Sequence, residues 1–448
     1  MLKNQDPLLY REMGRDYPVA ERTEGVYIYD TAGRRYIDAA GSYFTMHVGH
    51  RVEPVIAAVT RQLQSLDFAH TGFFTSEVAH RFAARLLGLA PAGFAKVLFT
   101  TSGSASNEAA IKLARQYHAL AGKPDKIKVI ARWHSYHGGS LGALSLTGHV
   151  PRRQPFDPLL LPFPHIEPPY CYRCPWGKTP ETCATDCADE LERTIHLVGA
   201  QNISAFIVEP VSGGPLGANP APDGYMKRVR EICDRHDMLM IVDEVITGAG
   251  RTGTKLGVDH WGVVPDVITM AKGICGGYVP TGAVLIHERV YGAFERVGVA
   301  LRHGETFSGH PLVCAIGDAV LEFIERQGLV ERARTLGAVL GRRLEALRGS
   351  PIVGDVRGIG LLRGIELVAD KATRRPFPRA RRVAARIAQA CADRGVIVVA
   401  GAGCVDGVDG DTISLSPPFT ITEAEIETVV STLAEAIDVV AADTPTAA

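Results

Sequence analysis

The chain has 448 residues, about three times the ~150 residues of a typical domain, so two or three domains are expected. Hydrophobic residues make up 46% and charged residues 22% of the sequence, which supports a sizeable core and excludes a disordered chain. The formal net charge of -1 excludes a strong overall field for nucleic acid or an anionic membrane, and it favours a small-molecule ligand.

The sequence also predicts a cytoplasmic protein. No apolar run approaches the ~18 residues that span a bilayer. The first residues lack the uninterrupted apolar stretch of a signal peptide. Nine cysteines, an odd number in a long chain without an export signal, favour thiols or metal ligands over a disulfide framework.

Short strands are predicted along most of the chain. Residues 26–29 and 35–38 flank an Asp-Thr-Ala-Gly turn and predict an N-terminal hairpin. From about residue 60, β-branched runs alternate with helical stretches. The strands predicted there are 96–100, 127–132, 205–210, 238–245, 266–272 and 282–287, with a helix from Ala105. Because these runs are apolar on both faces, they predict an α/β fold with a mainly parallel central sheet flanked by helices.

The C-terminal part predicts a second unit. After Pro311 the apolar spacing becomes helical, and residues 312–348 and 378–394 are predicted to be long helices. Strand-like pieces at 360–367, 395–400 and 412–416 lie among them. We therefore expect a large domain over 61–325 and a small α+β domain over 326–448, to which the N-terminal segment 1–60 contributes. Only the last residues, 441–448, are expected to be disordered.

Candidate functional residues follow the predicted strands, because ligands of open α/β sheets bind at the carboxyl ends of the strands. Residues 101–108 form a small-residue loop that enters a helix, where free backbone N–H groups suit a phosphate held by Gly103 and Ser104. The alternative is an N-capped helix with a tight turn. After the strand at 127–132, Tyr136 could stack on a planar ring or pack in a surface turn.

Two charged residues also end apolar strands. Asp243 needs a cationic partner because an isolated buried charge is costly, and Lys272 ends the next strand. The pair could be a buried salt bridge, or both groups could address one cofactor. A lysine of lowered pKa suits Schiff-base chemistry, and a carboxylate suits a pyridine nitrogen. Together with the phosphate loop and the aromatic residue, these groups describe a site for pyridoxal phosphate.

Six ordered segments closely resemble the class III pyridoxal-phosphate aminotransferases, and the resemblance runs from about residue 20 to residue 435. These segments are 101–115, 135–148, 208–214, 241–253, 270–284 and 305–311. The resemblance implies fold type I, with a large domain, a small domain built from both chain ends, and a homodimer or dimer of dimers with shared active sites.

The resemblance also implies roles for individual residues. Lys272 would hold the cofactor as an internal aldimine and then shuttle a proton. Asp243 would keep the pyridine nitrogen protonated, and Glu209 would lie near the phenolic oxygen and the substrate. Val245 and Tyr136 would cover the two ring faces, and Thr306 would reach the phosphate in the partner subunit. The full cofactor-binding set implied is Ser102, Gly103, Ser104, Tyr136, His137, Glu209, Asp243, Val245, Lys272 and Thr306.

The predicted reaction is a ping-pong transfer of an amino group from a primary amine or an ω- or β-amino acid to a 2-oxo acid such as pyruvate. An aminomutase, racemase or decarboxylase of the same fold is the alternative, as is a non-catalytic metal-binding protein. Tyr43 and Phe44 are expected to line the substrate pocket. Residues 396–419 contain no Arg or Lys, so Arg132, Arg152 or Arg153 would bind the substrate carboxylate, or no arginine would.

A cysteine cluster lies outside this family pattern. Its spacing is Cys-x2-Cys-x8-Cys-x3-Cys, formed by Cys171, Cys174, Cys183 and Cys187. Four thiolates at such a spacing are compatible with a closed tetrahedral structural zinc site. Free thiols and disulfides are the alternatives. A metal here would clip a proline-rich segment near the entrance of the active site and take no part in the chemistry.

Overall fold

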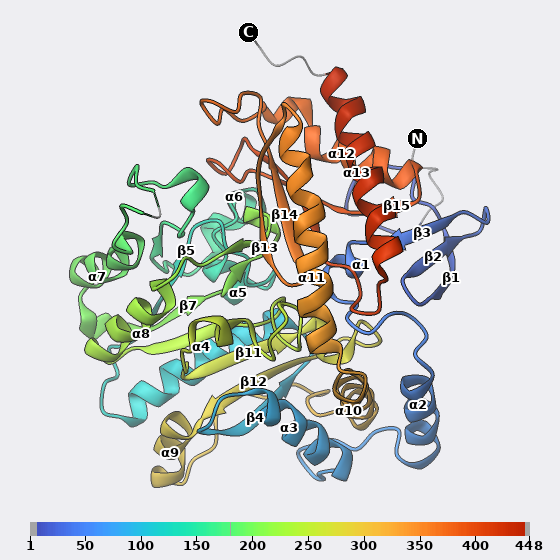
Figure 1. The fold of residues 1–448 in the computed structure, drawn as a ribbon. Coiled ribbons are helices and arrows are strands. Elements are labelled where there is room, and N and C mark those ends of the chain that lie inside the picture. The colour runs from blue at the N-terminus through green and yellow to red at the C-terminus, as the bar shows by residue number, and fades with distance from the viewer. Residues whose placement is uncertain (1–6, 180, 444–448) are drawn as a thin grey trace.

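The computed structural model describes residues 7–179 and 181–443, and a seven-stranded sheet forms its centre (Figure 1). The strands run in the order β4-β12-β11-β10-β7-β5-β6. Their bounds are β4 (Phe94–Thr100), β5 (Lys128–Arg132), β6 (His165–Ile166), β7 (Ile203–Val208), β10 (Leu239–Asp243), β11 (Val267–Ala271) and β12 (Gly282–His287). Within this sheet β12 alone runs opposite to the direction that the other strands share, so the prediction of a mainly parallel sheet is confirmed.

Helices cover both faces of the sheet, which explains why its strands are apolar throughout. In β10, Leu239 and Ile241 pack with apolar residues of α4 (Gly103–Leu120) and α9 (Glu288–Val297). The alternate residues Met240 and Val242 join a second core on the other face. That core includes buried residues of α7 (Asp186–Val198) and α8 (Tyr225–Arg235). Strand residues that alternate between two apolar layers are typical of a buried parallel sheet.

The two ends of the chain form one layer. The predicted hairpin is confirmed as β2 (Tyr27–Asp30) and β3 (Arg35–Asp38), which pair antiparallel, and β1 (Ala20–Glu24) joins β2. On its other side β3 pairs in parallel with β15 (Val396–Ile397). The blue N-terminal strands consequently lie beside the red C-terminal helices in Figure 1.

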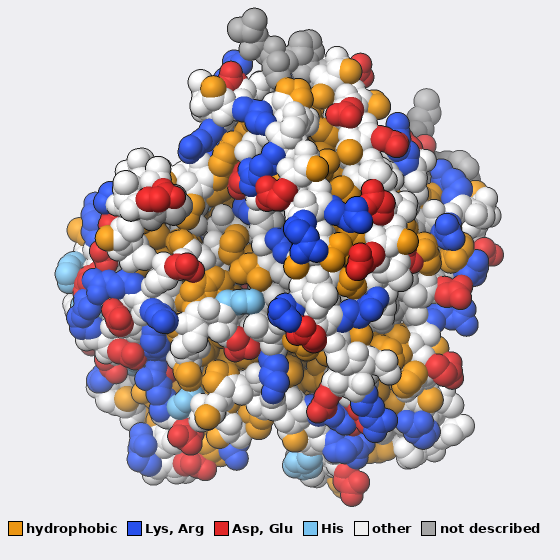
Figure 2. Space-filling view, viewed as in Figure 1, with side chains coloured by type: hydrophobic (Ala, Val, Ile, Leu, Met, Phe, Trp, Pro, Cys, Tyr) orange, Lys and Arg blue, Asp and Glu red, His pale blue; other side chains and the backbone are white. Residues whose placement is uncertain are grey.

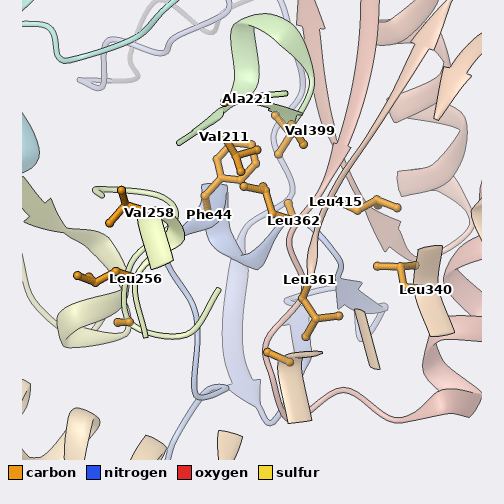
Figure 3. Close-up of a cluster of buried hydrophobic side chains, with 14 of the residues drawn as sticks. Phe44, Val211, Ala221, Leu256, Val258, Leu340, Leu361, Leu362, Val399 and Leu415 are labelled. Carbon is orange, nitrogen blue, oxygen red and sulfur yellow. The ribbon is translucent and has the colours of Figure 1, made fainter. Parts of the chain in front are cut away.

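The C-terminal part adds a second sheet and three helices. This sheet has the order β13-β14-β17-β16. Its strands are β13 (Val353–Ile359), β14 (Leu362–Leu367), β17 (Asp411–Leu415) and β16 (Val399–Ala402), and the helices are α11 (Leu329–Glu345), α12 (Val383–Asp393) and α13 (Glu423–Ala442). Figure 3 shows Leu362 and Val399 of these strands close to Phe44 and Val211, so one apolar core joins the C-terminal part to the large sheet region.

The remaining elements complete the large sheet region. The helices are α1 (Gly41–Phe44), α2 (Glu53–Ser65), α3 (Glu77–Leu89), α5 (Leu141–Leu146), α6 (Val150–Arg153) and α10 (Pro311–Arg326), and the short strands are β8 (Val211–Ser212) and β9 (Asn219–Pro220). Helix α10 packs against α2 and α3 (Figure 1). None of the helices in the described ranges is long and apolar enough to cross a membrane.

Two predicted helices differ from the structure. The helix predicted over 312–348 is two helices, because Gly328 has a φ of 58° and so ends the right-handed path after α10. The helix predicted over 378–394 begins only at α12, because Arg382 before it has a φ of 49°. Strand β13 and helix α13 were not predicted. Of the tail expected to be disordered, 444–448 lies outside the described residues, and the two residues before Asp443 belong to α13.

Candidate active site

A cavity of about 140 Å³ lies at the carboxyl ends of the parallel strands. Its wall comes from the residues that follow β4, β5, β7, β10 and β11, where the sequence analysis places the candidate site. The lining residues are Ser102, Gly103, Ser104, Tyr136, His137, Gly138, Glu209, Val211, Asp243, Val245, Ile246, Ala271 and Lys272. The structure thus gathers nine of the ten residues predicted to bind a cofactor, all but Thr306.

Lys272 follows β11 directly and faces this cavity with an unusual backbone. Its φ of 49° lies in the left-handed region, which a non-glycine residue rarely adopts and which costs about 1–3 kcal/mol. Burial lowers the pKa of its amine to about 8, against the opposing effect of the Asp243 and Glu209 carboxylates. About a tenth of the amine is therefore neutral at pH 7, and able to act as a nucleophile or a base, far more than for an ordinary lysine.

Asp243 ends the neighbouring strand β10 and is almost completely buried. Its carboxylate lies 2.7 Å from Nδ1 of His137 and accepts hydrogen bonds from Nδ2 of Asn107 at 2.8 Å and from the backbone N–H of Val245 at 3.0 Å. Asn107 is not among the residues predicted from the sequence. A polar residue one turn into a helix, on the side that faces the sheet, was the signal that could have found it.

The N-terminus of α4 provides the third part of the site. Ser102 caps this helix of 18 residues, since its Oγ accepts a hydrogen bond from the N–H of Ala105 at 3.2 Å. Oγ of Ser104 accepts one from the N–H of Gly139 at 3.1 Å. A Cβ added at Gly103 would lie 3.1 Å from the methyl groups of Val245, so the loop is packed closely. The alternative interpretation, a capped helix, is therefore confirmed. Gly103 and Ser104 also line the cavity, and phosphate binding by them stays a prediction.

Glu209 is fixed by Arg132. The Arg132 guanidinium donates hydrogen bonds to the backbone carbonyl of Glu209 at 2.9 Å and to its Oε2 at 3.1 Å. Oε1 of Glu209 accepts a hydrogen bond from the N–H of Tyr136 at 3.3 Å. Arg132 itself is fully buried and does not line the cavity, although the sequence analysis places it in the substrate pocket. Its guanidinium is committed to a carboxylate of its own chain.

Two further arginines follow in α6, and they differ in their surroundings. Arg153 pairs with Asp157 at 3.0 Å and donates to the carbonyl of Thr147 at 3.0 Å. Arg152 is exposed, and its guanidinium carbon lies 5.0 Å from the centre of the Tyr136 ring. Within the described part of the chain no carboxylate forms an ion pair with Arg152.

The two aromatic residues predicted to line the substrate pocket, Tyr43 and Phe44, do not lie in the wall of the cavity. Tyr43 is 47% exposed, and its hydroxyl lies 3.5 Å from the guanidinium of Arg152, outside the cavity wall. Phe44 points into the apolar core beside Val211 (Figure 3).

Thr306 is exposed in the loop that precedes α10 and does not reach the cavity of its own chain. Its neighbour Glu305 accepts hydrogen bonds from the N–H and the hydroxyl of Thr101 at 2.9 and 3.0 Å.

The predicted zinc site is not supported. The four thiols of Cys171, Cys174, Cys183 and Cys187 influence one another electrostatically, but they form no metal-ligand cluster in the described ranges. The segment is attached instead through Arg173, whose guanidinium lies 2.5 Å from the buried carboxylate of Glu366. The ion pair between Arg173 and Glu366 therefore attaches the proline-rich segment that a metal was predicted to hold.

Another group of potential metal ligands lies between α7 and α8. Glu192, His196 and His236 bring their ligand atoms within 4.8 Å of one another. The Glu192 carboxylate already forms ion pairs with Arg228 and Arg235, and the positive charges of these arginines oppose a bound cation. On the face shown in Figure 2, positive and negative side chains are mixed, as the balanced composition predicts.

Comparisons with known proteins agree with the geometry. The model of the family "Aminotransferase class-III" matches residues 11–437. The chain is 37% identical to an uncharacterized aminotransferase, YodT, of Bacillus subtilis, over 96% of this chain and 97% of the relative. An (S)-enantioselective omega-transaminase from Thermomicrobium roseum has a TM-score of 0.89 and 37% identity, over 95% of this chain and 93% of the other. An amine transaminase from an uncultivated Pseudomonas species, solved with PLP bound, has a TM-score of 0.90 and 36% identity, over 97% and 99%.

Proposed function

The chain belongs to the class III aminotransferases, enzymes of fold type I that use pyridoxal phosphate, and on this premise we propose that it transfers an amino group from a primary amine or an ω- or β-amino acid to a 2-oxo acid such as pyruvate. The observation that carries the proposal is the pair of Lys272 and Asp243 at the ends of adjacent strands, facing one cavity beside the N-terminus of α4.

The residues of the cavity fit pyridoxal 5′-phosphate. The N–H groups of Gly103 and Ser104 would hold its phosphate, helped by the positive end of the α4 dipole. Asp243 would bind the protonated pyridine nitrogen through a charge-assisted hydrogen bond, and Tyr136 and Val245 would contact the ring. When bound, this cofactor accepts the amino group and stabilises negative charge at the substrate carbon.

Lys272 would hold the cofactor and later move the proton. Its pKa of about 8 leaves part of the amine neutral at neutral pH, and only the neutral amine can take a proton from the substrate carbon and return it elsewhere. Its backbone is left-handed, and its side chain lines the cavity. Glu209, held by Arg132, would lie at the substrate side of the same cavity and orient the groups around the reacting carbon.

Arg152 would bind the carboxylate of the 2-oxo acid. Of the three candidate arginines, Arg132 is committed to Glu209 and Arg153 to Asp157. Arg152 lies over the ring of Tyr136, which lines the cavity, and within the described residues its guanidinium donates one long hydrogen bond, to the Tyr43 hydroxyl at 3.5 Å. Both substrates of a ping-pong enzyme use one site in turn. An exposed cation beside that site would bind a carboxylate and would still admit an amine that lacks one.

An exposed aromatic cluster supports a homodimer. Phe73 and Phe74 are 83% and 68% exposed, and Phe307 is 57% exposed. Phe68 lies 5.8 Å from Phe307, ring centre to ring centre, and the ring of His70 lies 6.5 Å from Phe68 and 5.8 Å from Phe73, so a row of aromatic rings joins Phe73 to Phe307. Thr306, which is also exposed, directly precedes Phe307 in the chain. A second copy of the chain would cover the cluster, and Thr306 would then approach the phosphate of that copy.

A donor screen with pyruvate as the acceptor tests the reaction, with alanine as the measured product. Donor supplied without an acceptor separates the reaction classes. A transaminase should release one equivalent of deaminated product per site and then stop, whereas a racemase, decarboxylase or aminomutase would continue. Sustained turnover without an acceptor would contradict the proposal.

A further inference from the structure

A chain of buried hydrogen bonds lies behind Asp243. Asn107 and Thr269 are almost completely buried, and neither lines the cavity. Nδ2 of Asn107 donates to Oδ2 of Asp243 at 2.8 Å and to the backbone carbonyl of His137 at 2.7 Å. Oδ1 of Asn107 accepts from the hydroxyl of Thr269 at 2.7 Å. Thr269 stands on β11, directly beside Asp243 in the register of the sheet.

This arrangement fixes the direction of each hydrogen bond. If the Asn107 amide were reversed, its oxygen would face the Asp243 carboxylate and the His137 carbonyl, which are both acceptors. The two acceptors therefore set the orientation of the amide, and the hydroxyl of Thr269 completes it by donating to the amide oxygen, which would otherwise be buried without a donor. Thr269 therefore acts on Asp243 through Asn107, without touching it by a side-chain hydrogen bond.

The donors divide unequally between the two oxygens of Asp243. Oδ2 lies within hydrogen-bond distance of both Asn107 and His137, while Oδ1 accepts one bond, from the backbone of Val245. Because an oxygen of a carboxylate has two lone pairs, Oδ1 keeps the free acceptor position. The Asp243 side chain cannot rotate without breaking buried hydrogen bonds, so Oδ1 remains the oxygen that can accept a further hydrogen bond.

We propose that Asn107 and Thr269 are positioning residues that hold the Asp243 carboxylate in the orientation required to bind a pyridinium nitrogen. This inference rests on the proposed function and assigns a part of it to two residues that touch neither substrate nor cofactor. It requires that their removal weakens the recognition of the ring nitrogen specifically. The phosphate and the lysine contacts involve other residues and should be unaffected.

The test compares two cofactors on the apoprotein: pyridoxal phosphate, and its 1-deaza analogue, in which a C–H replaces the ring nitrogen. The wild type should bind pyridoxal phosphate more tightly than the analogue, because only the former offers Asp243 a hydrogen bond. Asn107→Leu removes both donors. It should weaken the binding of pyridoxal phosphate about tenfold and that of the deaza analogue less than twofold.

A matched pair at the neighbouring position keeps the test informative if Asn107→Leu fails to fold. Thr269→Ser retains the hydroxyl and should keep the wild-type preference, whereas Thr269→Val, of nearly the same shape, should reduce it. Equal losses for both cofactors in Asn107→Leu and Thr269→Val would show a merely structural role and overturn the inference. A wild type that binds both cofactors equally would refute the role of Asp243, and one that binds neither would refute the proposed function.

Discussion

Replacement of Arg152 should separate substrates with a carboxylate from those without one. The change Arg152→Gln removes the charge but keeps a polar, though shorter, side chain beside Tyr136, whose ring centre lies 5.0 Å from the native guanidinium carbon. A charge-assisted hydrogen bond to a carboxylate contributes about 1.5–3 kcal/mol. Since each 1.36 kcal/mol corresponds to a factor of ten, kcat/KM for pyruvate should fall roughly 10- to 150-fold.

The exposure of Arg152 places the expected loss toward the lower end of that range, because water screens the charge. The assay uses one donor amine and two acceptors, pyruvate and propionaldehyde, which has no carboxylate. Only the value for pyruvate should fall. Arg152→Lys, a matched control that keeps the charge but not the guanidinium fork, should recover part of the loss. Equal losses for both acceptors, or none for pyruvate, would refute this assignment.

Three further predictions concern the assembly, the core and the cysteines. Inactive Lys272→Ala and Thr306→Ala chains, when mixed, should regain activity through hybrid dimers, whereas full activity of a monomer would exclude a shared site. Burial raises the pKa of Glu244 from 4.5 to about 7, so its contribution to stability should be lost as pH rises between these values. Thermal unfolding at both ends of this range should show a smaller difference in Glu244→Gln than in the wild type. Elemental analysis should find no zinc bound by the four clustered thiols, and about one zinc per chain would contradict the geometry.

The sequence predicts the central sheet well because strands buried on both faces must be apolar throughout. Each of the six strands predicted there forms, and the polar residues that follow them meet in one cavity. For Asp243 and Lys272, the position at the end of a strand is enough to predict that the two side chains share one site, since the carboxyl ends of adjacent parallel strands lie at one edge of the sheet. Helix ends are harder to predict: the break at Gly328 depends on a single left-handed residue inside a continuous apolar pattern.

Partnerships between distant residues could not be predicted. From the sequence, Arg132 is a plausible ligand for a substrate carboxylate. Only the structure shows that its guanidinium is already hydrogen-bonded to Glu209, 77 positions later in the chain. The proline-rich segment was likewise expected to need a metal, because Glu366, its actual partner through Arg173, lies far along the chain. Asn107 was missed for the same reason, since its role depends on Thr269 and Asp243.

Lys272 is the residue proposed to hold the cofactor, and the whole proposed reaction requires it. Borohydride reduction of the native enzyme, followed by peptide mapping, identifies that lysine, because reduction makes its bond to the cofactor permanent. We expect the label on the peptide that contains Lys272, and no label in the Lys272→Ala protein. A label on a peptide without position 272, in either protein, would contradict the central claim.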